Sequence, residues 1–104
     1  MLRVYDVMIG VLERLGPVIG MIEKRDADLA RQARRAASSV VLNIAEGSGS
    51  SAGNRSLRYR NALGSARETK ACLDVAKALY GLEVDPVTID QLDKVAFTLR
   101  RVLA

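Results

Sequence analysis

The sequence contains no histidine and no tryptophan, and it has one cysteine and two prolines among its 104 residues. Without histidine, the chain cannot supply the Glu-x-x-His ligands of di-iron bundles or the base of Ser-His and Cys-His nucleophiles. The single cysteine, Cys72, can neither form a disulfide within the chain nor complete a thiolate metal site. We therefore expect no metal, no cofactor and no catalytic residue, in a protein of the reducing cytoplasm.

Long hydrophobic runs are also missing. The longest stretch without a charged residue, residues 36–45, covers about half of the length that a membrane span requires. The first residues lead directly into a helical pattern, without the apolar segment of a secretory signal. We expect a soluble protein with no membrane partner, and a chain of this length predicts one domain, residues 1–104, with its own core.

The net charge of +4 is unevenly distributed. Residues 31–60 contain six arginines and one acid, Glu46, which gives this segment +5 and leaves −1 for the rest of the chain. Arginine outnumbers lysine by 12 to 4, and the planar guanidinium group suits bidentate contacts with phosphate. Two interpretations remain open, an anionic partner such as a nucleic acid and a solvated helix face.

Apolar side chains recur at helical spacing in the first half of the chain. Residues 5–22 alternate steps of three and four, and Gly16 with Pro17 predicts a kink or a short break because proline removes a backbone donor. A second helix is expected from a cap at Asp26 or Asp28 to Gly47. Its inward positions are mostly small, so we expect a neighbouring helix to approach it closely.

A third helix is predicted over residues 54–80, with Ser51 or Asn54 as its cap and Gly81 as its end. The stripe that we expect to face inward comprises Ser65, Glu68, Cys72, Val75 and Leu79. A second stripe lies beside it and comprises Ala62, Ala66, Thr69, Leu73 and Ala76. A fourth helix starts at Asp85 and Pro86. No segment alternates as a strand does, so the pattern predicts an all-α, antiparallel up-down-up-down four-helix bundle.

Polar side chains occupy core-like positions on the two middle helices. Asn43 and Glu46 lie one turn apart on the second helix, and Ser65 and Glu68 lie on the third. Burial without partners costs roughly 1–3 kcal/mol for each such group. We therefore predict one polar cluster between these helices, with Arg35 as its charge partner, that fixes the fold or the subunit contact. An enzyme that uses Glu46 or Glu68 in a water-filled pocket is a further alternative.

Arginines that we place near the turn between the second and third helices are the candidates for contact with RNA or DNA. They are Arg31, Arg34, Arg55, Arg58 and Arg60. Only one aromatic residue, Tyr59, lies among them and could stack on a base, so recognition would be mainly electrostatic. Repetition of such a surface around an oligomer would raise its avidity.

Valines widen the apolar faces of the first and fourth helices beyond the main stripes. They are Val4, Val11, Val18, Val95 and Val102. This width favours a subunit interface, although a broad core-facing stripe of an ordinary bundle has the same pattern.

Two segments of the chain resemble a known family. Residues 35–47, Arg-Ala-Ala-Ser-Ser-Val-Val-Leu-Asn-Ile-Ala-Glu-Gly, and residues 62–68, Ala-Leu-Gly-Ser-Ala-Arg-Glu, are similar to a bacterial four-helix-bundle family. The family is named for proteins encoded in intervening sequences of large-subunit ribosomal RNA genes, and it includes the accessory variability proteins of diversity-generating retroelements. Residues 4–6 and 73–76 also look like the family, so the resemblance covers essentially the whole chain.

The resemblance implies an all-helical cytoplasmic protein that assembles into a ring-like homo-oligomer, commonly a pentamer. Relatives in the retroelement branch are basic and bind nucleic acid and a reverse transcriptase, which makes RNA, DNA and a reverse transcriptase candidate partners. We therefore expect a non-enzymatic oligomeric bundle that acts as a nucleic-acid-binding accessory protein through its arginines. The alternative is a structural or protein-interaction scaffold.

Overall fold

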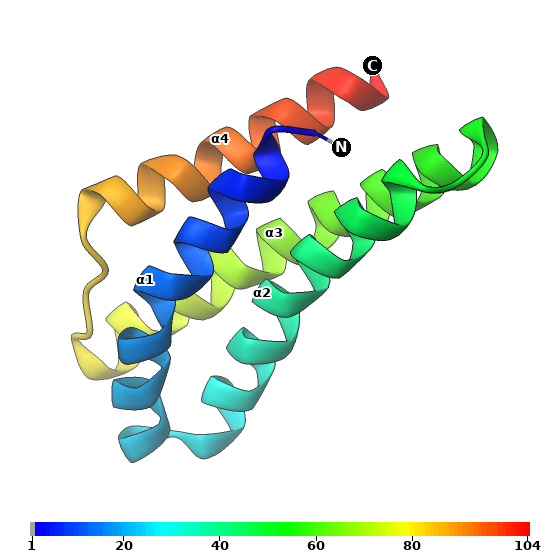
Figure 1. Ribbon diagram of the computed structural model, residues 1–104. Coiled ribbons are helices and arrows are strands. Elements are labelled where there is room, and N and C mark those ends of the chain that lie inside the picture. Colours follow the sequence, from blue (N-terminus) through cyan, green and yellow to red (C-terminus); the bar gives the residue numbers. More distant parts are fainter. Residues whose placement is uncertain (1) are drawn as a thin grey trace.

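The computed structural model describes residues 2–104, which form four α-helices and contain no strand. Helices α1 (Val4–Arg25), α2 (Ala27–Ser48), α3 (Ala52–Tyr80) and α4 (Pro86–Leu103) run alternately in opposite directions (Figure 1). Each helix packs against the next one along the chain, and α4 also packs against α1. The predicted all-α antiparallel four-helix bundle is confirmed.

Helix ends follow the local signals in the sequence. Asp26 precedes α2, and its carboxylate accepts a hydrogen bond of 2.9 Å from the Leu29 amide. Asp85, which immediately precedes Pro86, accepts an equivalent hydrogen bond of 2.9 Å from the Thr88 amide. Gly81 ends α3 with a φ of 69°, a left-handed conformation that glycine adopts without steric penalty. Ser51 precedes α3, but its side chain makes no capping hydrogen bond.

Helix α1 continues through Gly16 and Pro17, so the short break expected there is absent. Both residues are exposed. The carbonyl that loses its donor at Pro17 therefore lies on the water side of the helix, where solvent can satisfy it. This position explains why the helix tolerates proline in its interior.

The core lies between all four helices. Its largest fully buried side chains are Met8, Leu15, Ile22, Ile44, Leu92 and Leu99. Helix α3 adds the second of its two stripes, with Ala62, Ala66, Thr69, Leu73 and Ala76 all buried. The assignment of the first stripe to the core is wrong: Cys72 is buried, but Glu68, Val75 and Leu79 are exposed. The small side chains of α3 face the small side chains of α2, and the close approach of these helices leaves the neighbouring stripe outside.

The valines assigned to a subunit interface contribute mainly to this core. Val4, Val11 and Val95 are buried, Val18 is half-buried, and Val102 is exposed. The prediction of a spare apolar face is therefore wrong for the three buried valines, which belong to a broad core-facing stripe.

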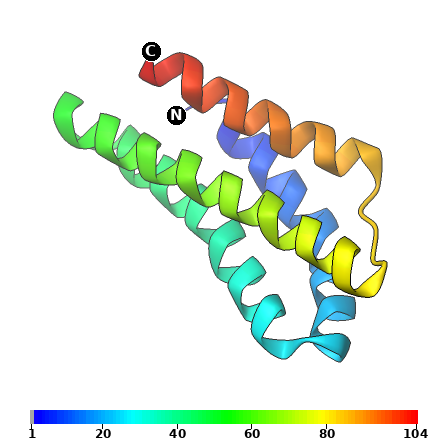
Figure 2. The same cartoon turned by 180° about the vertical axis from the view of Figure 1, so that it is seen from behind.

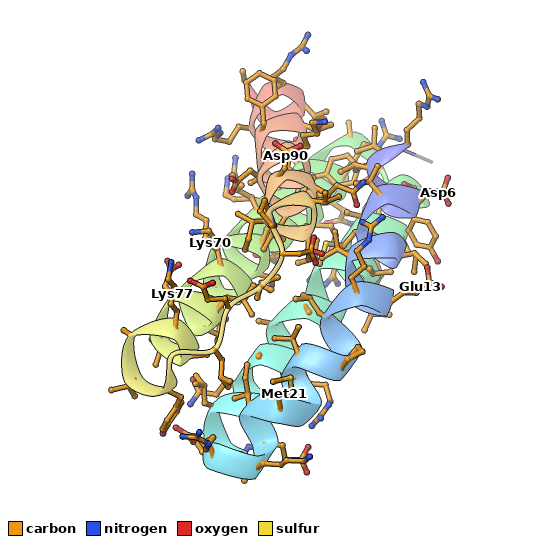
Figure 3. The ribbon with its side chains drawn as sticks, turned by 90° about the vertical axis from the view of Figure 1, so that its left-hand side faces the viewer. Asp6, Glu13, Met21, Lys70, Lys77 and Asp90 are labelled. Carbon is orange, nitrogen blue, oxygen red and sulfur yellow. The ribbon has the colours of Figure 1, made fainter. Side chains whose placement is uncertain are left out.

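Both chain ends lie at the same end of the bundle as the turn between α2 and α3 (Figures 1 and 2). The turn between α1 and α2 and the segment between α3 and α4 lie at the opposite end. Figure 3 shows Asp6 and Glu13 on the outer side of α1, across the molecule from Lys70 and Lys77 on α3. The labelled lysines have acidic partners on their own side of the bundle, because Lys70 pairs with Asp74 at 3.1 Å and Lys77 with Glu83 at 3.4 Å.

Candidate nucleic-acid interface

An open groove of about 490 Å³ runs along the outer side of α2. Arg31, Arg34 and Arg35 from α2 and Arg58 from α3 line it, together with other side chains that include Leu42, Asn43 and Glu46. The α2 residues recur at helical spacing, which places them on one side of the helix. We call this feature the arginine groove. It contains three of the five predicted nucleic-acid contacts, Arg31, Arg34 and Arg58, and adds Arg35.

The candidate arginines do not gather at the turn between α2 and α3. Helix α2 has 22 residues, which at about 1.5 Å each separates its ends by roughly 33 Å. Arg31 and Arg34 lie near its start, far from that turn. Arg55 and Arg60 lie outside the arginine groove, and Arg55 donates a hydrogen bond of 3.3 Å to the Ser50 carbonyl. The single cluster predicted at the turn is therefore wrong, because the arginine groove extends along α2 and two of the five candidates, Arg55 and Arg60, lie outside it.

Three of the four arginines in the groove form ion pairs. Arg31 pairs with Asp28, Arg34 with Glu23 at 2.8 Å, and Arg58 with Glu46 at 3.1 Å. Exposed pairs of this kind contribute at most about 1 kcal/mol, because water already solvates both charges. Arg35 makes no ion pair within residues 2–104. A phosphate group can therefore replace the acidic partners at low cost.

Tyr59 is unavailable for base stacking. Its side chain is only 4% exposed, and its hydroxyl lies 3.2 Å from the Ser48 Oγ. The ring packs against Gly47, whose missing side chain leaves room for it. The prediction that Tyr59 stacks on a base is wrong. The sequence signal that could have indicated the burial of Tyr59 is Gly47, because a glycine in the last turn of a helix allows another side chain to approach the backbone closely.

Ser39, which was not among the residues predicted for the polar cluster, is the centre of the polar contact between α2 and α3. Its hydroxyl oxygen accepts hydrogen bonds from Asn43 Nδ2 at 3.0 Å and from Ser65 Oγ at 2.8 Å. Asn43 Nδ2 also donates to the Ser39 carbonyl at 2.9 Å. The structure thus brings Asn43 and Ser65 together through Ser39. The spacing of four residues between Ser39 and Asn43 could have revealed this, because it places both on one face of α2.

The two glutamates are exposed, and the prediction that they are buried in this cluster is wrong. Glu46 pairs with Arg58 at the far end of α2. Glu68 and Arg35 line an open hollow of about 410 Å³ above the Ser39 and Ser65 contact, but they form no ion pair with each other within the described residues. Both carboxylates keep their hydration, which avoids the penalty of burying a charge.

Cys72 is buried, and this burial raises the pKa of its thiol, with a further increase from the negative charge of Glu68. Among residues 2–104, no three His, Cys, Asp or Glu side chains group closely enough to hold a metal ion. None of the helices described in this chain combines the length and the apolar character needed to cross a membrane.

The family model for the 23S rRNA-intervening sequence protein matches residues 2–103. Neither the curated proteins nor the solved structures include a match to this chain. The matched region contains all four helices and every residue of the arginine groove. The chain belongs to the family of 23S rRNA-intervening sequence proteins.

Proposed function

We propose that this protein is a non-enzymatic accessory protein of the cytoplasm that binds RNA, and that the arginine groove is its main contact surface. The observation that carries the proposal is the presence of four guanidinium groups along one open groove. The family description, which refers to ribosomal RNA, supports RNA as the ligand.

The groove can bind a phosphate backbone without reading bases. Each arginine that neutralises a phosphate releases a condensed counterion, so binding becomes weaker as salt is added. The ion pairs of Arg31, Arg34 and Arg58 orient their guanidinium groups in the free protein. Arg35 makes no ion pair in residues 2–104 and so gives up no charged partner when phosphate binds.

The experiment measures the affinity of a 12-nucleotide single-stranded RNA by fluorescence anisotropy over a series of salt concentrations. The groove variant carries Arg34→Gln and Arg35→Gln, and its control carries Arg60→Gln and Arg67→Gln, two exposed arginines outside the groove. We expect the groove variant to bind at least tenfold more weakly. The slope of log affinity against log salt should fall by about 1.4, which corresponds to two phosphate contacts on a single strand.

The control should stay within about twofold of the wild-type affinity. Equal losses in both variants would overturn the assignment of the groove, and a wild-type protein that does not bind RNA at low salt would overturn the proposed function. A DNA strand of the same sequence shows whether the sugar contributes to recognition.

The second candidate function is a scaffold that assembles through α3. Val75 and Leu79 are 41% and 65% exposed, although they continue the helical spacing of the buried Cys72. Exposed apolar residues at regular helical spacing form a surface that another protein chain can bind. We propose a second copy of this protein as the partner, in a closed ring whose expected subunit number is five.

Light scattering tests the assembly. One subunit has a mass of 11.3 kDa, so a pentamer would have five times this mass, about 56 kDa. Val75→Ser with Leu79→Ser should lower the measured mass, whereas Met21→Ser with Val87→Ser, at exposed positions on α1 and α4, should not. A monomeric wild-type protein, or equal effects of both double variants, would contradict assembly through α3.

A further inference from the structure

Phe97 is the most exposed aromatic side chain among residues 2–104. Its side chain is 51% exposed, whereas Tyr59 is buried and Tyr5 and Tyr80 are half-buried. Phe97 lies in the second half of α4, which ends beside the start of α1 (Figure 1). An exposed phenylalanine loses the stabilisation of burial, so its position outside the core calls for an explanation.

An open hollow of about 530 Å³ lies beside Phe97, between the start of α1 and the second half of α4. Four aliphatic residues line it: Leu2, Val4, Val7 and Val95. Sites for small organic molecules typically have volumes of about 300–1,000 Å³ and mainly apolar walls. We call this feature the Phe97 hollow. It is large and apolar enough to receive a flat aromatic ring.

Positive charges surround the ring of Phe97. The guanidinium carbons of Arg100 and Arg101 lie 5.9 and 5.8 Å from the ring centroid, and Arg3 and Lys94 line the hollow. Lys94 pairs with Asp90 at 3.3 Å, and both side chains are exposed. The three arginines, Arg3, Arg100 and Arg101, form no ion pair within the described residues, whereas three of the four arginines in the arginine groove do. An anion that enters here has three arginines without charged partners.

An apolar hollow, an exposed aromatic ring and unpaired arginines together match a nucleotide, which joins a flat ring to an anionic phosphate. Bases stack on aromatic side chains and on guanidinium planes with little sequence preference. We propose that one base of a single-stranded RNA or DNA stacks on Phe97 in the Phe97 hollow, while Arg100 and Arg101 bind the flanking phosphates. This inference rests on the proposed function and adds a preference for single strands to it, because bases in a duplex are not free to stack on a side chain.

A second hollow connects this site to the turn between α2 and α3. It has a volume of about 380 Å³, and Leu2 lines both hollows. Arg55 and Val102 also line the second one. Arg55 lies one turn before Arg58, which belongs to the arginine groove. A strand that leaves Phe97 can therefore pass Arg55 and reach the groove over the same end of the bundle.

The absence of tryptophan makes the stacking directly measurable, because Phe97→Trp introduces the only indole of the chain. We expect a single-stranded 12-mer of RNA to quench the fluorescence of Phe97→Trp to saturation, and a duplex of the same sequence to quench it much less. Anisotropy of the labelled RNA is recorded in the same titration. RNA that binds without quenching would overturn this inference and leave the proposed function intact, whereas the absence of any binding would overturn both.

A synthetic acidic peptide of alternating Glu and Leu residues serves as the competing ligand. A change in tryptophan emission with this peptide but not with RNA would also overturn the inference, and would identify the hollow as a protein-docking site.

Substitutions provide a second, independent measurement. Phe97→Leu keeps an apolar side chain without a π face, so the Kd for the single strand should rise about 5- to 150-fold, as expected for the loss of one stacked base. Phe97→Tyr should bind as the wild type does. The control is Val87→Ala, another exposed apolar position on α4 that lies outside the hollow.

The salt dependence separates stacking from charge. Phe97→Leu should leave the slope of log affinity against log salt unchanged, whereas Arg100→Gln with Arg101→Gln should reduce it by about 1.4. Wild-type affinity in Phe97→Leu, with its folding verified by circular dichroism, would contradict the inference.

Discussion

The ring of Tyr59 occupies the space that a side chain on Gly47 would need. A Cβ atom built on Gly47 would lie 2.5 Å from Tyr59 Cε1 and 2.8 Å from Cδ1. The ring is buried and its hydroxyl contacts Ser48, so it has little freedom to move away. We expect Gly47→Ala to lower the free energy of unfolding by about 1–3 kcal/mol, as for other overpacked sites. Urea denaturation measures this change.

Gly64→Ala is the matched control. No atom lies within 4 Å of a Cβ built on Gly64, and this glycine is exposed in the interior of α3. Alanine there should raise the free energy of unfolding by about 0.5–1 kcal/mol, because it restricts the unfolded chain and favours the helix. Changes of the same sign in both variants would contradict the role assigned to Gly47.

Ser39 and Ser65 should depend on each other energetically. Ser39→Ala removes a hydroxyl that accepts two hydrogen bonds, so we expect a loss of about 1–2 kcal/mol, and Ser65→Ala should lose about 1 kcal/mol. A double-mutant cycle should give a coupling of about 0.5–1 kcal/mol. Glu68→Gln, at an exposed position, should change stability by less than about 0.5 kcal/mol. A larger loss for Glu68→Gln than for Ser39→Ala would restore the cluster predicted from the sequence.

Acid should weaken the start of α2. The amide of Leu29 and, to a smaller extent, the hydroxyl of Tyr80 donate hydrogen bonds to Asp26, which hold the pKa of this carboxyl below its ordinary value of 3.8. Since the unfolded chain binds this proton more tightly, the stabilisation is complete above the unfolded pKa and is lost as the pH falls from there through the lower pKa of the folded state. Thermal unfolding recorded below about pH 5 should show a falling Tm. Asp26→Asn should reduce this fall. A variant whose Tm falls with acid as steeply as that of the wild type would contradict the role assigned to Asp26.

Pro17→Ala should stabilise the protein. Proline in a helix interior is about 3 kcal/mol less favourable than alanine, and the loss of its restriction on the unfolded chain offsets about 1 kcal/mol of the gain. Because Pro17 is exposed within the continuous helix α1, we expect a net gain of about 2 kcal/mol in the free energy of unfolding. A loss of stability would instead show that the packing of α1 requires the proline.

Cys72 should react slowly with thiol reagents in the native protein. The thiolate is the reactive form, and burial raises the pKa of this thiol above its ordinary value of 9.0. The rate of reaction with an aromatic disulfide at pH 8 should therefore be far below that of the unfolded chain. Glu68→Gln should increase the native rate slightly, because it removes the negative charge that disfavours the thiolate. Equal rates in the native and unfolded states would contradict the burial of Cys72.

The four helices could be predicted from the sequence because their signals are local. Asp26, Gly81 and Asp85 with Pro86 mark helix ends by chemistry that acts within a few residues. The inward face of α3 could not be predicted in this way. The stripe that contains Val75 and the stripe that contains Leu73 have the same period, and only the contact with α2 decides which of them is buried.

The candidate site was less predictable because it depends on distance and on packing between helices. A count of charges in residues 31–60 does not show which arginines share the arginine groove, because that depends on the length of α2 and on its packing against α3. The burial of Tyr59 depends on Gly47, which belongs to the preceding helix. Sequence spacing placed Asn43 and Ser65 near each other, but the hydroxyl that joins them, that of Ser39, emerges only from the packed helices.

The location of both chain ends has a practical consequence for every titration with nucleic acid. They emerge beside the turn between α2 and α3, next to Phe97 and Arg55. A purification tag fused to either end would lie close to these residues. An acidic tag would compete with the oligonucleotide for the arginines, and a basic tag would itself bind the oligonucleotide. Tags should be cleaved before measurement. A fluorophore is better attached at the opposite end of the bundle, for example at the exposed Glu83 between α3 and α4.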